Sequence, residues 1–183
     1  MPENPTIELR TFETANAPDL FSLIDTNRPQ LAKFWWESQT NSVEDSALFI
    51  EKARVDESYT GRVTRGVWCG ETLVGVGSVH SVEWELGRAA LGCWIDHQHH
   101  SKGYATETVR QLSQLAFERM NLSVVTIGCR EDNEGTRHVA EKAGFLLDVI
   151  DDSPTWNTVD GTTPRTVHYR LERPIKLIKA SRQ

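Results

Sequence analysis

The sequence has little of what marks a membrane, secreted or nucleic-acid-binding protein. No apolar run among its 183 residues is long enough to cross a bilayer, and its polar opening residues do not form a secretory signal. The net charge is −6, whereas binding to nucleic acid needs a basic stripe. We therefore expect a cytoplasmic protein that binds neither membranes nor nucleic acid directly. Its acidity leaves cationic partners such as amines open.

Cysteine is scarce too. The three cysteines, Cys69, Cys93 and Cys129, stand apart in apolar or strand-like surroundings, which favours reduced core thiols over disulfides or a metal cluster. Histidines gather in one loop, at His97, His99 and His100. Their spacing is irregular and no second cluster accompanies them, so we expect no metal site.

The length predicts one domain over residues 1–183, with a core at about residues 6–172 and a frayed basic tail. Apolar residues at helical spacing from Ala17 predict a short helix that ends before Pro29. Ser42, followed by acidic residues, is typical of the N-cap of a second helix.

Ile7, Leu9 and Phe12 predict a first strand before these helices. The elements expected after the second helix are strands over 65–69 and 73–80, joined by a tight turn at Gly70-Glu71. They are followed by a strand over 91–96, a long helix from Ala105, a strand over 124–129, a helix over 133–143, and strands over 145–150 and 167–171. The strand over 124–129 is expected to be buried and parallel to its neighbour. The order β-α-α-β-β-β-α-β-α-β-β predicts an α/β (α+β) fold. Its mixed, mostly antiparallel sheet of about six or seven strands would have helices on both faces.

The stretch His100-Ser-Lys-Gly-Tyr-Ala-Thr106 lies between an alternating strand and an amphipathic helix. That arrangement exposes free backbone N–H groups at the positive end of a helix dipole, which suits a phosphate or pyrophosphate. Gly103 would let such a ligand approach closely. The alternative is an ordinary strand-to-helix turn, because one glycine is a weak signal and neither the dinucleotide fingerprint nor the P-loop pattern is present.

Three stretches together resemble the GNAT N-acetyltransferase superfamily, and within it the RimJ/RimL-like branch that acetylates ribosomal-protein N-termini. They are Arg88-Ala-Ala-Leu-Gly-Cys-Trp-Ile-Asp96, the loop His100-x-x-Gly103-x-Ala105, and Asn133-x-x-Thr136-x-x-Val139-x-Glu141-x-x-Gly144-Phe145. Two departures from the family pattern are His100, where Gln or Arg is usual, and Ser101, where Gly is frequent. Backbone donors do most of the phosphate binding, so the loop tolerates both changes.

The resemblance implies transfer of an acetyl group from acetyl-CoA to an amine by direct attack in a ternary complex. The pyrophosphate would bind the loop, and the pantetheine would run beside one strand of a splayed parallel pair. A backbone N–H near Trp94 or Ile95 would stabilise the oxyanion. The implied cofactor contacts are Cys93, Trp94, Ile95, His100, Ser101, Lys102, Gly103, Tyr104, Ala105, Thr106 and Asn133.

Catalytic residues are harder to assign. Many relatives place a tyrosine seven residues after the motif asparagine, and here that position is Ala140. Thr136 is therefore the candidate proton donor to the leaving thiolate, the alternative being that it only fills the first helical turn that Asn133 caps. Glu83 and Glu85 are the candidate bases, and solvated turn residues are the alternative for each.

The resemblance favours the α-amine of a ribosomal-protein N-terminus as the acceptor. The branch often carries Asp-His before its final tyrosine, whereas this chain has Arg165-Thr166. A small amine, such as a polyamine or an antibiotic, is the alternative acceptor, and a non-catalytic acyl-CoA sensor is the alternative function. The tryptophans Trp35, Trp36, Trp84 and Trp156 would line the acceptor cleft or pack in the core. Exposed tryptophans also weakly favour a homodimer.

Overall fold

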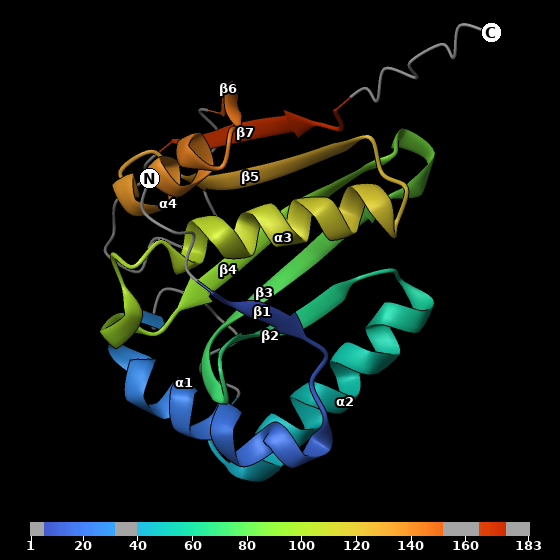
Figure 1. Ribbon diagram of the computed structural model, residues 1–183. Helices are drawn as coiled ribbons and strands as arrows, with labels where there is room; N and C mark the ends of the chain where they lie inside the picture. Colours follow the sequence, from blue (N-terminus) through green and yellow to red (C-terminus); the bar gives the residue numbers. More distant parts are fainter. Residues whose placement is uncertain (1–5, 32–39, 152–164, 175–183) are drawn as a thin grey trace, which may run out of the picture.

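The computed structural model describes residues 6–31, 40–151 and 165–174 (Figure 1). Its strands are β1 (Glu8–Arg10), β2 (Val63–Cys69), β3 (Thr72–Glu83), β4 (Arg88–Ile95), β5 (Val124–Arg130), β6 (Leu146–Asp151) and β7 (Thr166–Glu172). Its helices are α1 (Ala17–Leu31), α2 (Val43–Tyr59), α3 (Tyr104–Glu118) and α4 (Glu134–Lys142). Short 3₁₀ turns are η1 (Thr14–Asn16), η3 (Trp84–Leu86) and η4 (His97–His99). None of the helices in these ranges is long and apolar enough to cross a membrane.

The strands form one seven-stranded sheet in the order β1-β2-β3-β4-β5-β7-β6. Neighbouring strands run antiparallel except β4 and β5, which are parallel at the centre of the sheet. The crossover between these two strands is α3, as the length of a parallel connection requires. The predicted element order and mixed, mostly antiparallel sheet are confirmed.

The helices cover both faces of the sheet. Alternate residues of a strand point to opposite faces, so Val79 of β3 packs in the core with α3 and α4, whereas Val76 packs in a second core with α1 and α2. Leu112 of α3 and Ile50 of α2 are fully buried on the two sides. The sheet is therefore held rigidly between two layers of helices, and its central strands are positioned precisely enough to carry a site.

Two local expectations need correction, and others lie outside the described residues. The first helix continues through Pro29 to Leu31, because proline in a last turn removes only one intrahelical bond and Leu31 is buried against the second core. The strand over 124–129 is buried on one face only, at Val125 and Ile127. The tail after Pro174, together with the segments that contain Trp35, Trp36 and Trp156, lies outside the described residues.

Other local signals are confirmed. The Ser42 side chain accepts a hydrogen bond from the Asp45 N–H at 3.0 Å and begins α2. Gly70 has a φ of +60° in the tight turn between β2 and β3. Asn133 caps α4, which ends at Lys142 before Gly144. Each signal is local because the capping or turn residue acts on backbone groups within a few positions of itself.

Candidate active site

The two parallel strands at the centre of the sheet separate part-way along their length. Pairing of β4 with β5 covers only three positions and ends at Ala90 and Thr126. The Thr126 hydroxyl donates to the main-chain oxygen of Ala89 at 3.4 Å near this last pair. Beyond it β4 runs on to Ile95 and β5 to Arg130, with no further pairing. The predicted splay is confirmed, and it leaves backbone groups of both strands without ladder partners.

The pairing of β4 with β3, its neighbour on the other side, identifies which amides of β4 face this opening. The Asp96 N–H donates to the Val74 oxygen at 2.8 Å on the β3 side. Since N–H groups along a strand point alternately to its two sides, those of Ile95 and Cys93 point towards the opening. The Trp94 amide belongs to the β3 side. Of the two oxyanion donors predicted from the sequence, Ile95 is the one that the strand geometry favours.

The loop before α3 presents a row of amides. Gly103, the residue before α3, has a φ of +80°, and Ser101 has a φ of +60°. The first helical bond there runs from the Glu107 N–H to the Gly103 oxygen at 3.0 Å. Among the described residues, the amides from Ser101 to Thr106 have no hydrogen-bond partner. Free N–H groups at the N-terminus of an amphipathic helix fit a diphosphate.

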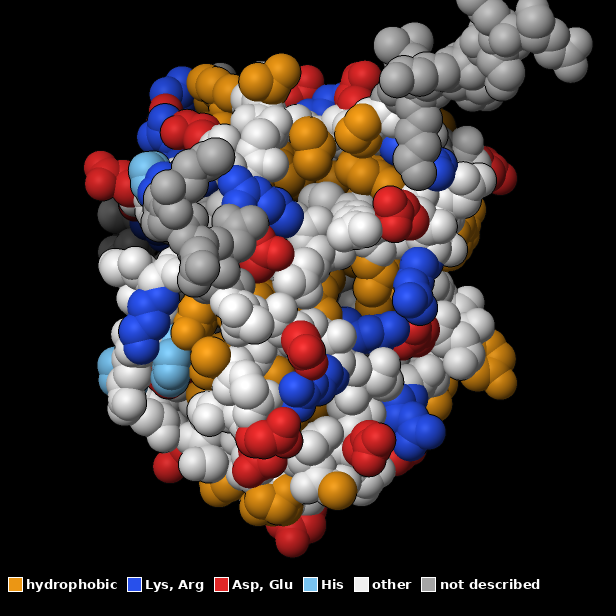
Figure 2. Space-filling model, in the orientation of Figure 1, with side chains coloured by type: hydrophobic (Ala, Val, Ile, Leu, Met, Phe, Trp, Pro, Cys, Tyr) orange, Lys and Arg blue, Asp and Glu red, His pale blue; other side chains and the backbone are white. Residues whose placement is uncertain are grey.

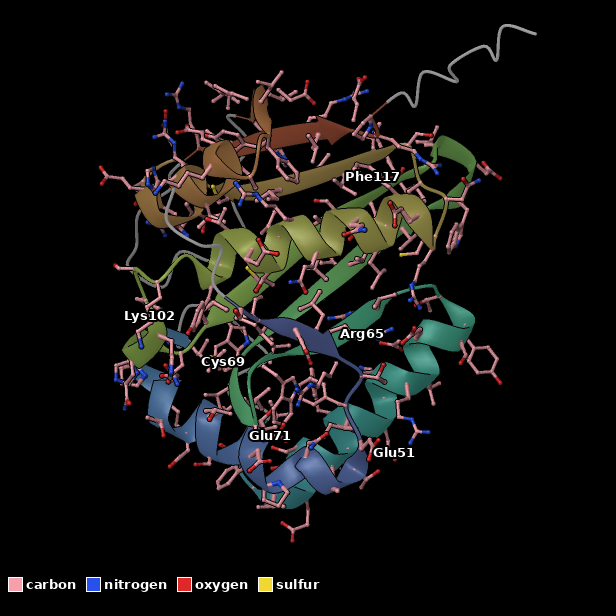
Figure 3. All side chains as sticks on the ribbon, viewed as in Figure 1. Glu51, Arg65, Cys69, Glu71, Lys102 and Phe117 are labelled. Carbon is pink, nitrogen blue, oxygen red and sulfur yellow. The ribbon has the colours of Figure 1, made fainter. Side chains whose placement is uncertain are left out.

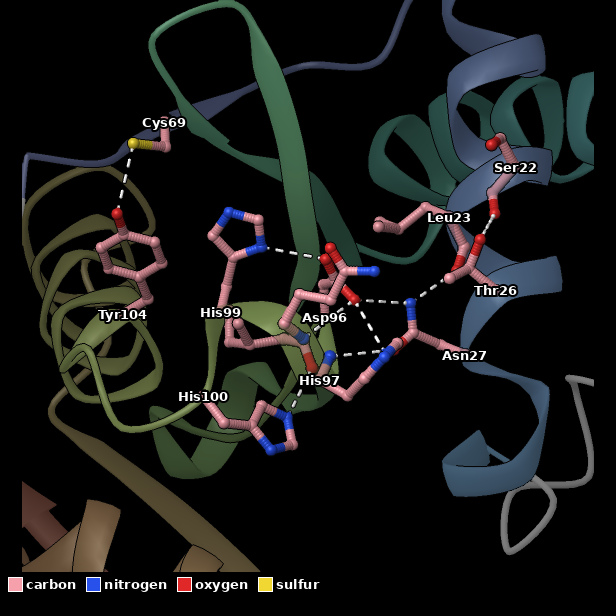
Figure 4. Close-up of polar contacts among 12 residues, drawn as sticks. Ser22, Leu23, Thr26, Asn27, Cys69, Asp96, His97, His99, His100 and Tyr104 are labelled. Carbon is pink, nitrogen blue, oxygen red and sulfur yellow. Dashed lines mark hydrogen bonds and ion pairs between the residues drawn. The ribbon is translucent and has the colours of Figure 1, made fainter.

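The His100 side chain, directly after η4, fixes this loop to the end of β4. The His100 Nε2 donates to the Ile95 oxygen at 2.9 Å (Figure 4). A phosphate would therefore meet the other ring nitrogen, Nδ1, which donates only when the ring is protonated. Lys102 projects from the loop beside α3 in Figure 3. Histidine side chains and side chains of lysine or arginine lie along the left edge of Figure 2.

A buried carboxylate lies beneath the loop. Asp96 is 7% exposed and accepts hydrogen bonds from His99 Nδ1 at 2.9 Å and from Asn27 Nδ2 at 3.0 Å. Burial raises its pKa, but the hydrogen bonds from His99, Asn27 and the Gln98 amide outweigh burial, so the pKa of Asp96 lies below its usual value. A buried, ionised carboxylate with several donors gives the loop a rigid base.

Asn27 was missed by the sequence reasoning. Its side chain is buried on α1, where it also accepts from the His97 N–H at 2.9 Å and donates to the Leu23 oxygen at 2.8 Å. The signal available was an asparagine on the apolar stripe of a helix, because a buried amide needs hydrogen-bond partners. The sequence alone does not say that these partners lie in the loop after β4.

The start of α3 is held by an aromatic contact. The rings of His99 and Tyr104 stack with centroids 5.9 Å apart, and the Tyr104 hydroxyl lies 3.3 Å from Cys69 Sγ.

The two cysteines of the central strands, Cys93 of β4 and Cys129 of β5, are unreactive. Burial raises the pKa of the Cys93 thiol to about 12, and burial also raises the pKa of Cys129. Both thiols are therefore protonated at neutral pH and are poor nucleophiles, which fits direct attack by an amine.

The predicted acid stands at the start of α4. The Asn133 Oδ1 accepts from the Thr136 N–H at 3.1 Å, so the asparagine is the helix cap. Thr136 is half-buried in the first turn of α4, directly after β5. Ala140 is fully buried where many relatives have a tyrosine. The cap that the sequence predicted is confirmed, and the role of Thr136 stays a prediction.

The two candidate bases lie at the other end of β4 from the loop. Glu83 ends β3, and both its oxygens accept from Arg88, at 2.8 and 2.9 Å. This hydrogen-bonded pair lowers the pKa of Glu83, which makes it a weaker proton acceptor at neutral pH. Glu85 is exposed in η3. Trp84 of the same turn packs against Gly61. Among the described residues, no contact of Glu83 or Glu85 brings its carboxylate towards the opening.

Two histidines that the sequence reasoning missed flank the opening on the face opposite α3. His80 of β3 is paired with Ala90, and His168 of β7 is paired with Gly128. A Cβ added at Gly92 would lie 3.4 Å from His80 Nε2, and one at Gly128 would lie 3.2 Å from His168 Nδ1. Each ring thus sits over a glycine on the strand that borders the opening. No sequence signal places these residues together, since the pairing is long-range.

Comparison with known proteins decides the family. A model of the acetyltransferase (GNAT) domain matches residues 6–146. The chain belongs to the acetyltransferase (GNAT) family. It is similar to YdaF of Bacillus subtilis (strain 168), which is named as a ribosomal N-acetyltransferase. The identity is 30% over 145 residues, covering 78% of this chain and 79% of YdaF.

Other similarities agree with this membership. The ribosomal-protein-serine acetyltransferase of Escherichia coli (strain K12) is 24% identical over 144 residues, covering 78% of this chain and 80% of the relative. A solved structure of RimL, the ribosomal L7/L12 α-N-protein acetyltransferase, in complex with coenzyme A has a TM-score of 0.83 at 21% identity. That likeness covers 93% of this chain and 96% of that one and shows the shared fold.

This GNAT protein is therefore an acetyl-CoA-dependent N-acetyltransferase, with acetyl-CoA as its co-substrate. The residues present fit that co-substrate, because the loop offers free amides for a diphosphate and the splayed strand offers free amides beside it. Binding of a diphosphate by this loop also accounts for Gly103. Its left-handed φ directs the chain into α3, and no side chain of this residue covers the free amides.

Proposed function

We propose that this enzyme acetylates the α-amine of a protein N-terminus, and that a ribosomal protein in the cytoplasm is the acceptor. Two relatives, YdaF and the Escherichia coli enzyme, are named for ribosomal acceptors. Their names support the class of acceptor, and the chemistry of the amine and of the acceptor face supports it independently.

The α-amine is the easier nucleophile for this site. Attack needs the neutral amine, and at neutral pH a lysine side chain offers about 400-fold less of it than an α-amine, given ordinary pKa values near 10.4 and 7.8. The two candidate carboxylate bases, Glu83 and Glu85, lie at the other end of β4 from the loop. A site without a strong carboxylate base is matched to the less basic amine.

The face opposite α3 carries the observation on which this proposal depends. Among the described residues, those on this face where the opening begins include Ser78, His80, Ala90, Gly92, Thr126, Gly128 and His168. None of these seven has a carboxylate, whereas a polyamine carries several positive charges that need anionic partners. Ala90, Gly92 and Gly128 have small side chains or none, which leaves room beside the two histidine rings for an extended main chain to approach the strands.

The geometry supports the following binding roles. The amides from Ser101 to Thr106 would bind the diphosphate, with His100 and Lys102 beside it. The pantetheine would lie along Cys93, Trp94 and Ile95, close to Asn133. The co-substrate supplies the activated acetyl thioester. The Ile95 amide would stabilise the oxyanion, and the Thr136 hydroxyl would protonate the leaving sulfur.

Acetylation of defined amines tests the acceptor. Release of CoA thiol and the mass of each product are measured with peptides that start with a free α-amine and contain one lysine. The matched control is the same peptide with a blocked N-terminus, and a polyamine is the competing substrate. We expect one acetyl group on the free N-terminus and little on the blocked peptide. Preferential acetylation of lysine or of the polyamine would contradict the proposal.

A further inference from the structure

His80 stands beside the point where β4 and β5 separate. It is cross-strand partner to Ala90, the last residue of β4 that pairs with β5. Residues paired across strands share a face, so His80 lies on the face opposite α3, next to Gly92. A Cβ at Gly92 would be 3.4 Å from His80 Nε2. The ring nitrogen therefore borders the surface from which an amine can approach the opening.

A local irregularity holds the ring in this position. The pairing of β3 with β4 shifts register between His80 and Glu83, and Ser81 has a φ of +50°, which is strained for a residue with a side chain. At this irregularity within β3, the Ser81 hydroxyl lies 3.1 Å from His80 Nδ1. Bulges in strands commonly re-aim a side chain beside an active site.

The Ser81 contact defines the chemistry of the other ring nitrogen. When the Nδ1 N–H donates to the Ser81 hydroxyl, Nε2 carries the lone pair. Nε2 has no hydrogen-bond partner among the described residues. Burial, and then the positive charge of Arg62, lower the pKa of His80. The neighbours on β4, Ala90 and Gly92, carry no charge. Because its pKa is lowered from 6.5, the ring is mainly neutral at neutral pH.

We propose that His80 is the general base of the acetyl transfer. This rests on the proposed function only in requiring an amine acceptor. His80 Nε2 takes one proton from the bound ammonium group and passes it to water. The amine nitrogen then attacks the thioester carbonyl, forming the C–N bond and breaking the C–S bond. The second proton ends on the CoA sulfur, and the third stays on the amide nitrogen.

His168 provides a matched comparison. It lies on the same face, also sits over a glycine, and borders the opening from the β7 side. It lacks the strained serine that orients His80. The proposal therefore assigns proton transfer to one of two similarly placed histidines, and replacement of His168 controls for changes in charge and shape on this face.

The test compares His80→Gln with His168→Gln. For the wild-type enzyme, kcat at saturating substrates should rise with pH through a pKa below 6.5, the ordinary value from which that of His80 is lowered. For His80→Gln, kcat near pH 7 should fall about 100-fold, and the rise should move towards the pKa of the amine, near 7.8. Acetyl-CoA affinity and melting temperature should stay close to wild type. His168→Gln alters the same acceptor face, so the KM for the amine can change, but the pH profile of kcat should stay that of the wild type.

Chemical rescue separates a catalytic role from a structural one. His80→Ala should regain activity when imidazole is added, because imidazole can occupy the space and accept the proton. A His80→Gln enzyme with wild-type kcat and pH profile would overturn the proposal, and so would equal losses in both histidine variants. All variants are assayed with whichever amine the wild type accepts best. A preference for polyamines would overturn the proposed acceptor but leave this comparison decisive.

Discussion

Asn27 of α1 and Asp96 at the end of β4 are joined by a buried hydrogen bond of 3.0 Å between Nδ2 and Oδ1. The two residues are 69 positions apart in the chain. Because Asp96 also accepts from His99, this bond connects the helical layer opposite α3 to the loop whose free amides would bind the diphosphate (Figure 4). The stability of the loop therefore depends on a helix distant in sequence.

Replacement of Asn27 should loosen the loop. Asn27→Ala removes donors and acceptors from Asp96 and His97, and a buried carboxylate that loses a partner costs about 1–3 kcal/mol of unfolding free energy. Affinity for acetyl-CoA should fall as well. Thr26→Ala is the control, since Thr26 is exposed on the same helix and surface changes usually stay within about 0.5 kcal/mol. Equal effects of the two variants, measured by urea unfolding and calorimetry, would contradict this prediction.

Gly103→Ala should weaken binding of acetyl-CoA at least tenfold. Two costs combine there, the strain of alanine at a φ of +80° and a methyl group beside the amides. Gly144→Ala carries the strain alone, because Gly144 has a φ of +94° in open space after α4. Both variants should lose comparable stability, and only Gly103→Ala should lose affinity in a titration. Unchanged affinity would reject the phosphate-binding loop.

Thr136→Ala should lower kcat by about tenfold to a hundredfold while leaving acetyl-CoA affinity near wild type, because a general acid acts on the transition state. Thr136→Ser keeps the hydroxyl and should keep most of the activity. The N-cap should survive in both, since Asn133 accepts from the backbone N–H of residue 136. A Thr136→Ala enzyme with normal kcat would remove this residue from the acid role.

Replacement of glycine by alanine should have different consequences on the paired strands β3 and β4, at Gly75 and at Gly92. At Gly75 a Cβ would collide with the main-chain oxygen of Trp94. Gly75→Ala should therefore force β3 and β4 apart and destabilise the protein by about 1–3 kcal/mol. At Gly92 a Cβ meets His80 and Ser78 at ordinary contact distances. Gly92→Ala should fold normally and lower activity. Thermal melting together with kcat/KM distinguishes the two variants. A Gly75→Ala enzyme that is stable but inactive would contradict the assignment of Gly75 to packing between β3 and β4.

The pH dependence of stability offers an independent measure of His80. Its pKa is lowered in the folded state from 6.5, so between that lowered value and 6.5 the unfolded chain binds more protons. The free energy of unfolding should therefore rise with pH across this window. In His80→Gln that contribution is absent, so the stability of the wild type relative to this variant should fall as pH falls from about 7 to 5. Parallel unfolding profiles of the two proteins would show that the pKa is not lowered.

Signals that act over a few residues could be predicted from the sequence. The N-cap at Ser42, the turn at Gly70 and the helix start after Gly103 each depend on the φ angle or hydrogen bonds of neighbouring backbone groups. The one error in a helix boundary, at Pro29, arose because burial of Leu31 compensates for the bond that proline removes.

The sequence by itself determined the order of the elements, the family resemblance and the loop before α3, since alternation, helical spacing and the motif residues are all carried by contiguous chain. Only the tertiary structure decided which side chains meet at the opening. The register of β3 on β4 brings His80 over Gly92, and the packing of α1 brings Asn27 to Asp96. Such contacts join residues that are far apart in the chain, so no local pattern of residue types encodes them.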